Sequence, residues 1–406
     1  MTDQMESKTE SAEDTELSAA LMAIWGNPEM SSNPQPMHAR LRKGGATLRV
    51  GPMVMLNTRA AVEEALSKPE VFSSQMSSSR LGNTRPLIPM QIDPPDHRKY
   101  RKLLDPLFSN RQIGWLESEI TDMVGGLIDT FIHDGTCDYT EAFATPIASL
   151  VMLRLLGLPA GDVAELARMK DGIVHPPRRN PAETEGVQRA AGQELYRYFQ
   201  AAVEAKRHHP DEGLVSVLLT SDVDGRPLTS DEIVDICYLL ILAGLDTVAD
   251  ALTLSTVYLA RNPDARQLLI ADPSRIPAAI EELLRWESPV PGVSRLVTAD
   301  STVAGCPVKP GDLVFIGYGA ANTDPEPLPD ATTVRFDRDQ NRHVAFGTGI
   351  HRCLGAQLAR LELRVALTVW HHRIPDYEIS AGSALTYAPG LRSVLNLPLT
   401  FSPTAT

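Results

Sequence analysis

Cysteine is scarce in this chain. Among 406 residues there are only four, and they lie far apart, with no CxxC pair and no histidine at the spacing of a zinc site; they are Cys137, Cys237, Cys306 and Cys353. Cysteines scattered in this way disfavour both a disulfide framework and a structural zinc site. A cysteine with a special role must therefore act alone, and its neighbours have to reveal that role.

Positive charge is also in short supply. Thirty-eight lysines and arginines face 51 acidic residues, which gives a formal net charge of −13. This balance argues against a protein that binds nucleic acid through its overall charge, although a local basic patch could still serve an acidic partner. One cluster of basic residues lies between positions 98 and 111, and arginines 352, 360 and 364 surround Cys353. If the two groups share a face, an acidic protein could dock there.

The chain lacks an unbroken membrane-spanning run, a fixed-period repeat and a low-complexity linker. Its most apolar stretch, CYLLILAGL, lies within residues 230–261, a segment that Asp235, Asp246 and Asp250 interrupt. Charges inside a membrane span are costly, so this segment is better explained as a helix buried in a soluble protein. Residues 1–15 are polar and acidic, unlike a secretion signal or a membrane anchor. We therefore expect a disordered tail at 1–15, one domain over 16–406, and a monomer in the cytoplasm.

Helical patterns dominate what is present. The longest predicted helix, 230–261, begins with the capping-box pattern TSDE and ends before Asn262-Pro263. Strand-like runs occur in TLRVGPMVML near residue 50, at 301–318 and in SVLNLPLTF near the end of the chain. Residues 174–192, rich in proline and charge, are predicted to form a mobile loop.

The segment FGTGIHRCLG, residues 346–355, sets Cys353 apart from the other cysteines. Its glycines permit a tight loop or a close approach, and the helical pattern AQLARLELRVALTVW follows at once. A cysteine just before a helix start lies where backbone N–H groups and the helix dipole favour the thiolate. Such a thiolate is a nucleophile or a metal ligand. His351 would be its general base in the first case, and a cation facing an anionic group in the second.

FGTGIHRCLGAQLAR resembles the haem-binding loop of the cytochromes P450, whose pattern FxxGxxxCxG is met by Phe346, Gly349, Cys353 and Gly355. The resemblance covers roughly residues 40–402. It implies a mainly α fold, the P450 fold, in which a large helical part carries a small β-rich lobe. It also implies haem b as cofactor, with Cys353 as the thiolate ligand of its iron.

The resemblance assigns roles to further polar residues. The family's ExxR pair corresponds to Glu282 and Arg285. Buried charges must be paired, and the family completes this group with an arginine before a phenylalanine, which is Arg335 of VRFD here. The family's acid–alcohol pair, which relays protons, corresponds to Asp246 and Thr247 in the middle of the long helix. The groups expected to meet the haem propionates are His97, Arg101, Arg295 and His351.

The activity implied by the resemblance is a haem-thiolate monooxygenase that hydroxylates a hydrophobic small molecule with O2 and two electrons from a ferredoxin and its reductase. Some stretches resemble the camphor-hydroxylating branch, but Arg85 and Val293 stand where that branch has a substrate-bonding tyrosine and an aspartate near the haem. A terpenoid, a branched lipid or a steroid is therefore the expected substrate. The apolar residues expected to line its chamber are Leu87, Ile88, Leu239, Leu242, Ala243, Val293 and Val394.

Two other functions stay open at this point. A non-catalytic haem-binding sensor would need Cys353 but no proton relay, so Asp246 and Thr247 count against it. A hydrolase with Cys353 as nucleophile and His351 as base would need a third group to orient the histidine, and the sequence reveals none.

Overall fold

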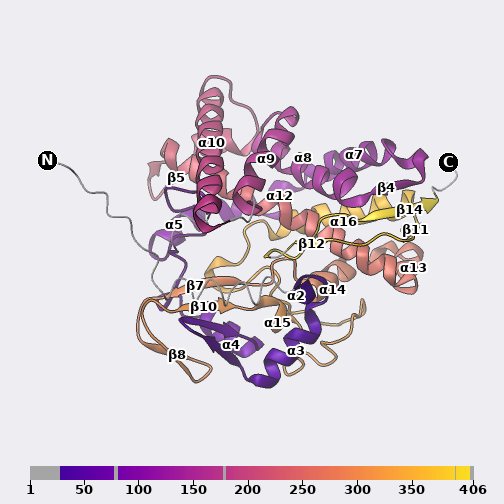
Figure 1. Ribbon diagram of the computed structural model, residues 1–406. Helices are drawn as coiled ribbons and strands as arrows, with labels where there is room; N and C mark the ends of the chain where they lie inside the picture. Colours follow the sequence, from indigo (N-terminus) through magenta and orange to yellow (C-terminus); the bar gives the residue numbers. More distant parts are fainter. Residues whose placement is uncertain (1–27, 77–80, 177–179, 389, 403–406) are drawn as a thin grey trace.

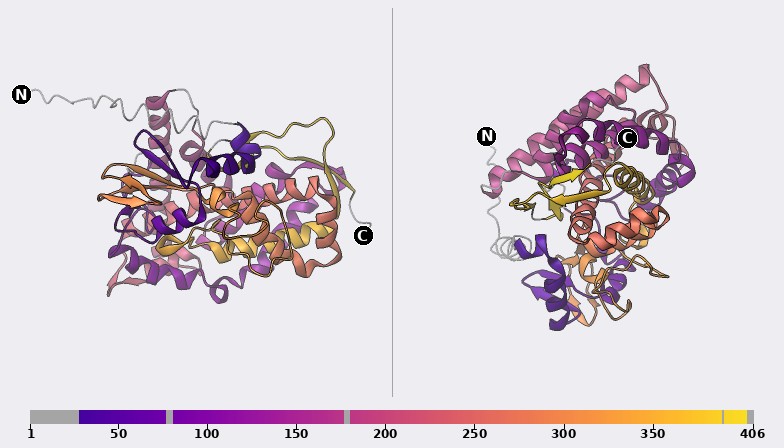
Figure 2. Two further views of the ribbon diagram at one scale, coloured as in Figure 1. Left: turned by 90° about the horizontal axis from the view of Figure 1, so that it is seen from below. Right: turned by 90° about the vertical axis from the view of Figure 1, so that its right-hand side faces the viewer.

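The computed structural model describes residues 28–76, 81–176, 180–388 and 390–402 (Figure 1). The tail predicted at residues 1–15 lies outside the described residues. Helices make up most of the described chain, and the five-stranded sheet forms a smaller lobe together with α3 and α4. Both views of Figure 2 show this lobe beside the helical part. The prediction of a mainly α fold with a small β-rich lobe is confirmed.

The α-helices differ widely in length, and α12 is the longest in the described part of the chain. In chain order they are α2 (Pro28–Ser32), α3 (Pro34–Gly44), α4 (Arg59–Leu66), α5 (Asp96–Leu107), α6 (Asn110–Ile113), α7 (Leu116–Asp129), α8 (Thr145–Leu156), α9 (Val163–Val174), α10 (Pro181–His208), α11 (Leu214–Leu219), α12 (Ser230–Arg261), α13 (Pro263–Ala271), α14 (Ile276–Glu287), α15 (Tyr318–Asn322) and α16 (Ala356–Arg373). A π-helical turn, η3 (Thr140–Ala144), leads into α8.

The strands form small sheets. The largest has the order β1 (Thr47–Val50), β2 (Met53–Leu56), β10 (Leu313–Ile316), β7 (Val293–Val297) and β3 (Phe72–Ser73), and only the β2–β10 pair is parallel. A second sheet joins β11 (Asp376–Ile379), β14 (Pro398–Ser402) and β4 (Thr136–Asp138). The remaining strands form hairpins: β5 (Asp222–Val223) with β6 (Arg226–Pro227), β8 (Ser301–Val303) with β9 (Cys306–Val308), and β12 (Tyr387–Ala388) with β13 (Ser393–Val394). All three strand-like regions are therefore confirmed.

The long helix α12 has the bounds that its sequence predicts. The Thr229 side chain accepts a hydrogen bond from the Glu232 N–H, and the Glu232 carboxylate accepts the Thr229 N–H at 2.7 Å, which completes the capping box. Helix α12 contacts α8, α10, α14 and α16, and most of its side chains are buried. None of the helices in the described part of the chain has the length and the apolar character needed to cross a membrane.

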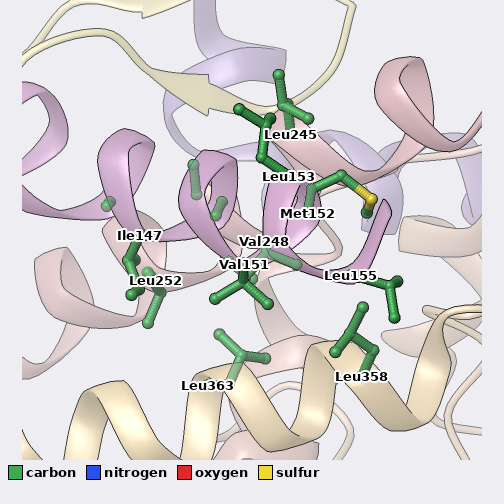
Figure 3. Close-up of a cluster of buried hydrophobic side chains, with 14 of the residues drawn as sticks. Ile147, Val151, Met152, Leu153, Leu155, Leu245, Val248, Leu252, Leu358 and Leu363 are labelled. Atoms are coloured by element: carbon green, nitrogen blue, oxygen red, sulfur yellow. The ribbon is translucent and has the colours of Figure 1, made fainter. Parts of the chain in front are cut away.

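The core around α12 explains its central glycine. Figure 3 shows side chains of α8, α12 and α16 gathered in one cluster, with Val151 of α8 pointing towards Leu363 of α16. A Cβ atom on Gly244 would lie 2.1 Å from Cε of Met152, which belongs to α8. Gly244 therefore lets α8 approach α12 closely, in addition to any looseness that it gives the helix.

One predicted element is wrong. Residues 181–192, expected to belong to a mobile loop, form the first turns of α10. Asn180 begins this helix by accepting a hydrogen bond from the Glu183 N–H, and proline follows directly at the first helical position. Asn-Pro is therefore a helix start here rather than a loop signal, because proline fits the first turn without losing a hydrogen bond. Residues 177–179 of the predicted loop lie outside the described residues.

Candidate functional site

The Cys353 loop is closed by its own backbone. The Cys353 N–H donates a hydrogen bond to the Phe346 carbonyl oxygen at 2.8 Å, and α16 begins three residues after the cysteine. Gly347 and Gly349 adopt positive φ angles of 65° and 71°. A Cβ at either position would lie 2.9 Å from an oxygen atom, the Tyr318 hydroxyl or the Leu66 carbonyl. Only glycine fits both positions without strain.

Cys353 differs from the other three cysteines in its accessibility. Its side chain is exposed, whereas Cys137 and Cys237 are buried and Cys306 is half-buried. The protein around the Cys353 thiol removes water from it, and this desolvation raises its pKa. The Gly355 N–H and three positive charges act in the opposite direction and lower the pKa; these charges belong to Arg101, Arg352 and Arg360. A thiol that is accessible on one side and faced by these positive groups is suited to bind a cation as a thiolate.

The four groups predicted to meet an anion lie together beside this loop. The ring centroids of His97 and His351 are 4.2 Å apart, and Arg101 of α5 donates to the Arg352 carbonyl at 2.9 Å. The pKa of His351 is lowered to about 3, first by burial and then by the nearby charges of Arg295, His97 and Arg101. Burial likewise lowers the pKa of His97 to about 4 and that of Arg295 below its ordinary value.

This basic cluster fits the propionate groups of haem. Both ring nitrogens of His97 are buried, and neither has a hydrogen-bond partner among the described residues. Arg295 donates to the carbonyl oxygen of its own neighbour, Ser294, at 2.9 Å, and His351 contacts the Ser74 hydroxyl at 2.9 Å. Buried donors without acceptors are costly, so the cluster calls for an anion that supplies them. The donor set therefore suits haem with Cys353 as its iron ligand.

The ExxR pair forms a buried triad, but its third member is not the predicted one. Arg285 donates to both oxygens of Glu282 at 2.8 and 2.7 Å, and neither side chain is exposed. The third cation is Arg338, whose Nε lies 3.0 Å from each Glu282 oxygen. Arg335 contributes only its backbone N–H, at 2.8 Å, while its side chain points to solvent and pairs with Asp337 and Asp330. The assignment of the Arg335 side chain to the triad is wrong, because at this position the backbone N–H faces Glu282 and the side chain faces solvent.

The acid and the alcohol predicted as a proton relay bind different partners. Asp246 pairs with Lys170 of α9, and His175 lies 3.3 Å from its other oxygen. Burial alone would raise the pKa of Asp246, but His175 and Lys170 outweigh burial and lower it. The Thr247 hydroxyl donates to the Ala243 carbonyl at 2.7 Å, within α12. Lys170 and His175 carry no local sequence signal, since only the packing of α9 on α12 brings them to Asp246.

The apolar residues predicted to line a substrate chamber differ in accessibility. Ala243 is exposed and Val293 is half-buried. Ile88, Leu239 and Leu242 are 7–8% exposed, and Leu87 and Val394 are enclosed in the main core. A direct contact with a ligand is therefore open to Ala243 and Val293, whereas Leu87 and Val394 can only support the wall.

Arg85 points away from the middle of α12. Its guanidinium donates to both oxygens of Asp235 at 2.9–3.1 Å and lies 5.0 Å from the centre of the Tyr196 ring. Asp235 precedes Asp246 by eleven residues, or about 16 Å along a helix. Arg85 thus ties its segment to the start of α12.

The structure divides the basic residues around the Cys353 loop into two groups. Four of them are balanced by acids: Lys99 by Asp96, Arg101 by Asp105, Arg360 by Glu281 and Arg364 by Glu117. In the part of the chain that the structure describes, the other four side chains form no ion pair, and these are Arg98, Lys102, Arg111 and Arg352. Of the eight basic residues, these four are therefore the ones that could present a net positive charge to a partner.

Comparison with known proteins identifies the family to which the chain belongs. The family model described as Cytochrome P450 matches residues 177–370. The chain is 36% identical over 341 residues, 83% of this chain and 80% of the relative, to "Probable cytochrome P450 127A1" of Sinorhizobium fredii. It is 34% identical over 386 residues, 91% of this chain and 94% of the relative, to "Vitamin D(3) 25-hydroxylase" of Pseudonocardia autotrophica.

A solved structure agrees with these relatives. The structure of CYP109E1 from Bacillus megaterium in complex with testosterone has a TM-score of 0.84 and 29% identity, and the match covers 92% of this chain and 99% of that one. The alternatives of a cysteine hydrolase and a non-catalytic sensor are therefore set aside. The chain belongs to the cytochrome P450 family, and it is a monooxygenase that carries haem b.

Proposed function

We propose that Cys353 binds the haem iron as a thiolate and that the chain hydroxylates a hydrophobic small molecule. The observation that carries this proposal is the pairing of an accessible cysteine with a nearby basic cluster in which, among the described residues, the buried ring nitrogens of His97 lack a hydrogen-bond partner. Haem with a thiolate ligand would supply the chemistry that cleaves O2. The protein would supply protons to the site and exclude water from it. His97, Arg101, Arg295 and His351 would hold the propionates.

Asp246 and Thr247 are proposed to move protons from solvent towards the site. The side chain of His175 is 28% exposed, so it joins Asp246 to the protein surface. Asp246 can deliver a proton only after it loosens its pair with Lys170, because a carboxylate held by an ammonium group is a poor base. The Thr247 hydroxyl, now donating to the Ala243 carbonyl, must rotate to continue the path.

The proposed substrate is a terpenoid, a branched lipid or a steroid. Two findings support this class: Ala243 and Val293 offer apolar, accessible surface, and the similar proteins include a vitamin D(3) hydroxylase and a structure with testosterone. A pocket of this kind holds its ligand by apolar contact, with few polar groups to fix orientation.

The proposed electron donor is a small acidic ferredoxin, reduced in turn by a ferredoxin reductase. The four unpaired cations, Arg98, Lys102, Arg111 and Arg352, would attract it to the Cys353 side of the molecule. Four free cysteines suit the reducing cytoplasm, where we place the protein. We also propose that residues 16–406 form one domain and that the chain acts as a monomer.

The proposal is tested by reconstitution. The holoprotein, a ferredoxin, its reductase and NADH are supplied with isotopically labelled O2 and with each substrate class in turn, and products are identified by mass spectrometry. We expect one labelled oxygen atom in a product from at least one class, and loss of that product in Thr247→Ala while NADH is still consumed. If no class yields a labelled product, or if water supplies the oxygen, the proposal is wrong.

A further inference from the structure

Helix α14 carries two adjacent glutamates that serve separate networks. Glu282 faces the interior and binds the buried arginines of the ExxR triad. Glu281 faces the segment that leads to Cys353. Its carboxylate receives a bidentate pair of hydrogen bonds from Arg360 of α16, with both N–O distances 2.7 Å. This fork geometry fixes the guanidinium in one plane.

A histidine shares the same carboxylate. His343 has Nε2 3.0 Å from a Glu281 oxygen, and its Nδ1 accepts the Ala345 N–H at 3.1 Å. Because Nδ1 is occupied as an acceptor, Nε2 must carry the proton and donate to Glu281. Burial alone would raise the pKa of Glu281, but Arg360 and His343 outweigh burial and hold it at about 2.

Both partners of Glu281 contact the ring of Phe346. The Arg360 guanidinium carbon lies 4.6 Å from the ring centroid, and the His343 ring centroid lies 5.9 Å away at a tilt of 44°. A guanidinium over an aromatic face is an attractive contact. Phe346 is also the residue whose carbonyl accepts the Cys353 N–H. One carboxylate thus holds two side chains against the residue that closes the Cys353 loop.

We propose that Glu281, Arg360 and His343 act together as a clamp on Phe346, and that the charge balance of this clamp sets the reduction potential of the haem. The proposal rests on the proposed function, in which Cys353 is the iron ligand. The three are positioning residues, because their side-chain contacts lead to Phe346, which closes the Cys353 loop. The charge of Arg360 also acts on the Cys353 thiol directly.

The proposal gives two variants opposite effects. Glu281→Gln leaves the positive charge of Arg360 unbalanced, which favours the reduced iron, so the potential rises. Arg360→Gln leaves a negative carboxylate, which favours the oxidised iron, so the potential falls. At low ionic strength and a fixed applied potential, each change should alter the ratio of ferrous to ferric protein by about tenfold. This is the effect of one unit charge at roughly 10 Å through an effective dielectric constant near 20.

The next salt bridge along α16 is a matched control. Arg364, four residues after Arg360, pairs with Glu117 at 2.9 and 2.8 Å, whereas the cation that lies over the Phe346 ring is Arg360. Arg364→Gln removes a positive charge from the same helix as Arg360, and Glu117→Gln removes the negative partner of Arg364, which lies on α7. They should shift the potential by less than a third of the effect at Glu281 and Arg360.

The experiment is a spectroelectrochemical titration of each holoprotein, with the double variant Glu281→Gln/Arg360→Gln included. Shifts of opposite sign in the single variants and a near wild-type potential in the double variant support the clamp. Shifts of one sign in both, or equal shifts in the controls, overturn it, because general loosening of the loop would act in one direction. If a single variant does not fold, the double variant and the other single variant still decide the sign. Failure of the proposed function is separate: it would appear as an unchanged carbon monoxide spectrum in Cys353→Ser.

Discussion

Arg338 is predicted to be a main support of the buried ExxR triad. Its guanidinium contacts both Glu282 oxygens at 3.0 Å and donates to the carbonyls of Asp330 and Thr333 at 2.7 and 2.9 Å. Arg338→Met removes these donors from a place where the Arg338 side chain is only 7% exposed and Glu282 is fully buried. Loss of one partner from a buried ion pair costs about 3–5 kcal/mol.

The lower end of that range applies, because Glu282 keeps Arg285 and the Arg335 N–H. A cost of about 3 kcal/mol corresponds to roughly a hundredfold change in the ratio of folded to unfolded protein. The assay is equilibrium unfolding in urea, followed by the fluorescence of the four tryptophans and by the haem absorbance. Arg335→Met is the control and should leave the midpoint unchanged, since its side chain is solvent-exposed. A larger loss in Arg335→Met than in Arg338→Met would refute the assignment of the triad.

Three more outcomes follow from the packing and the charges. Gly244→Ala should lower the free energy of unfolding in urea by about 1 kcal/mol, because crowding Met152 costs about 1–3 kcal/mol and helix propensity returns at most about 1 kcal/mol; a gain in stability would contradict the close approach of α8 and α12. Lys170→Met should shift the pH profile of turnover to higher pH, because the lysine charge no longer opposes the rise in the pKa of Asp246 that burial causes; a profile that does not move would exclude the pair from the proton path. The stability that Glu281 contributes is present above its unfolded-state pKa of about 4.5 and is lost as pH falls towards 2; the stability difference between wild type and Glu281→Gln should therefore shrink over that range, and a constant difference would contradict the ion pair.

Local signals predicted those parts of the fold that depend on neighbours in the chain. The bounds of α12 follow from the capping box at Thr229 and from Asn262-Pro263, and both act within a few residues. The Cys353 loop was recognisable because positions such as Gly347 and Gly349 need positive φ, which leaves a glycine pattern in the sequence. A turn or a cap is therefore visible in sequence before any tertiary contact is known.

Side-chain contacts between segments that are far apart in the chain could not be predicted from the sequence. VRFDRD offers two arginines to Glu282, and only the path of the loop decides that the Arg338 side chain and the Arg335 backbone reach it. The lysine that pairs with Asp246 comes from α9, 76 residues earlier in the chain, and its own segment resembles any amphipathic helix. Such pairs are fixed by helix packing, which leaves no spacing rule to find.

The central claim is that Cys353 is the thiolate ligand of the haem iron, and the carbon monoxide difference spectrum of the reduced protein tests it most directly. The wild-type holoprotein is expected to show the Soret band at the wavelength that gives the P450 family its number. Cys353→Ser should retain haem through the cluster of His97, Arg101, Arg295 and His351 but lose that band. A Cys353→Ser protein that keeps the band, or a wild-type holoprotein that lacks it, would contradict the account.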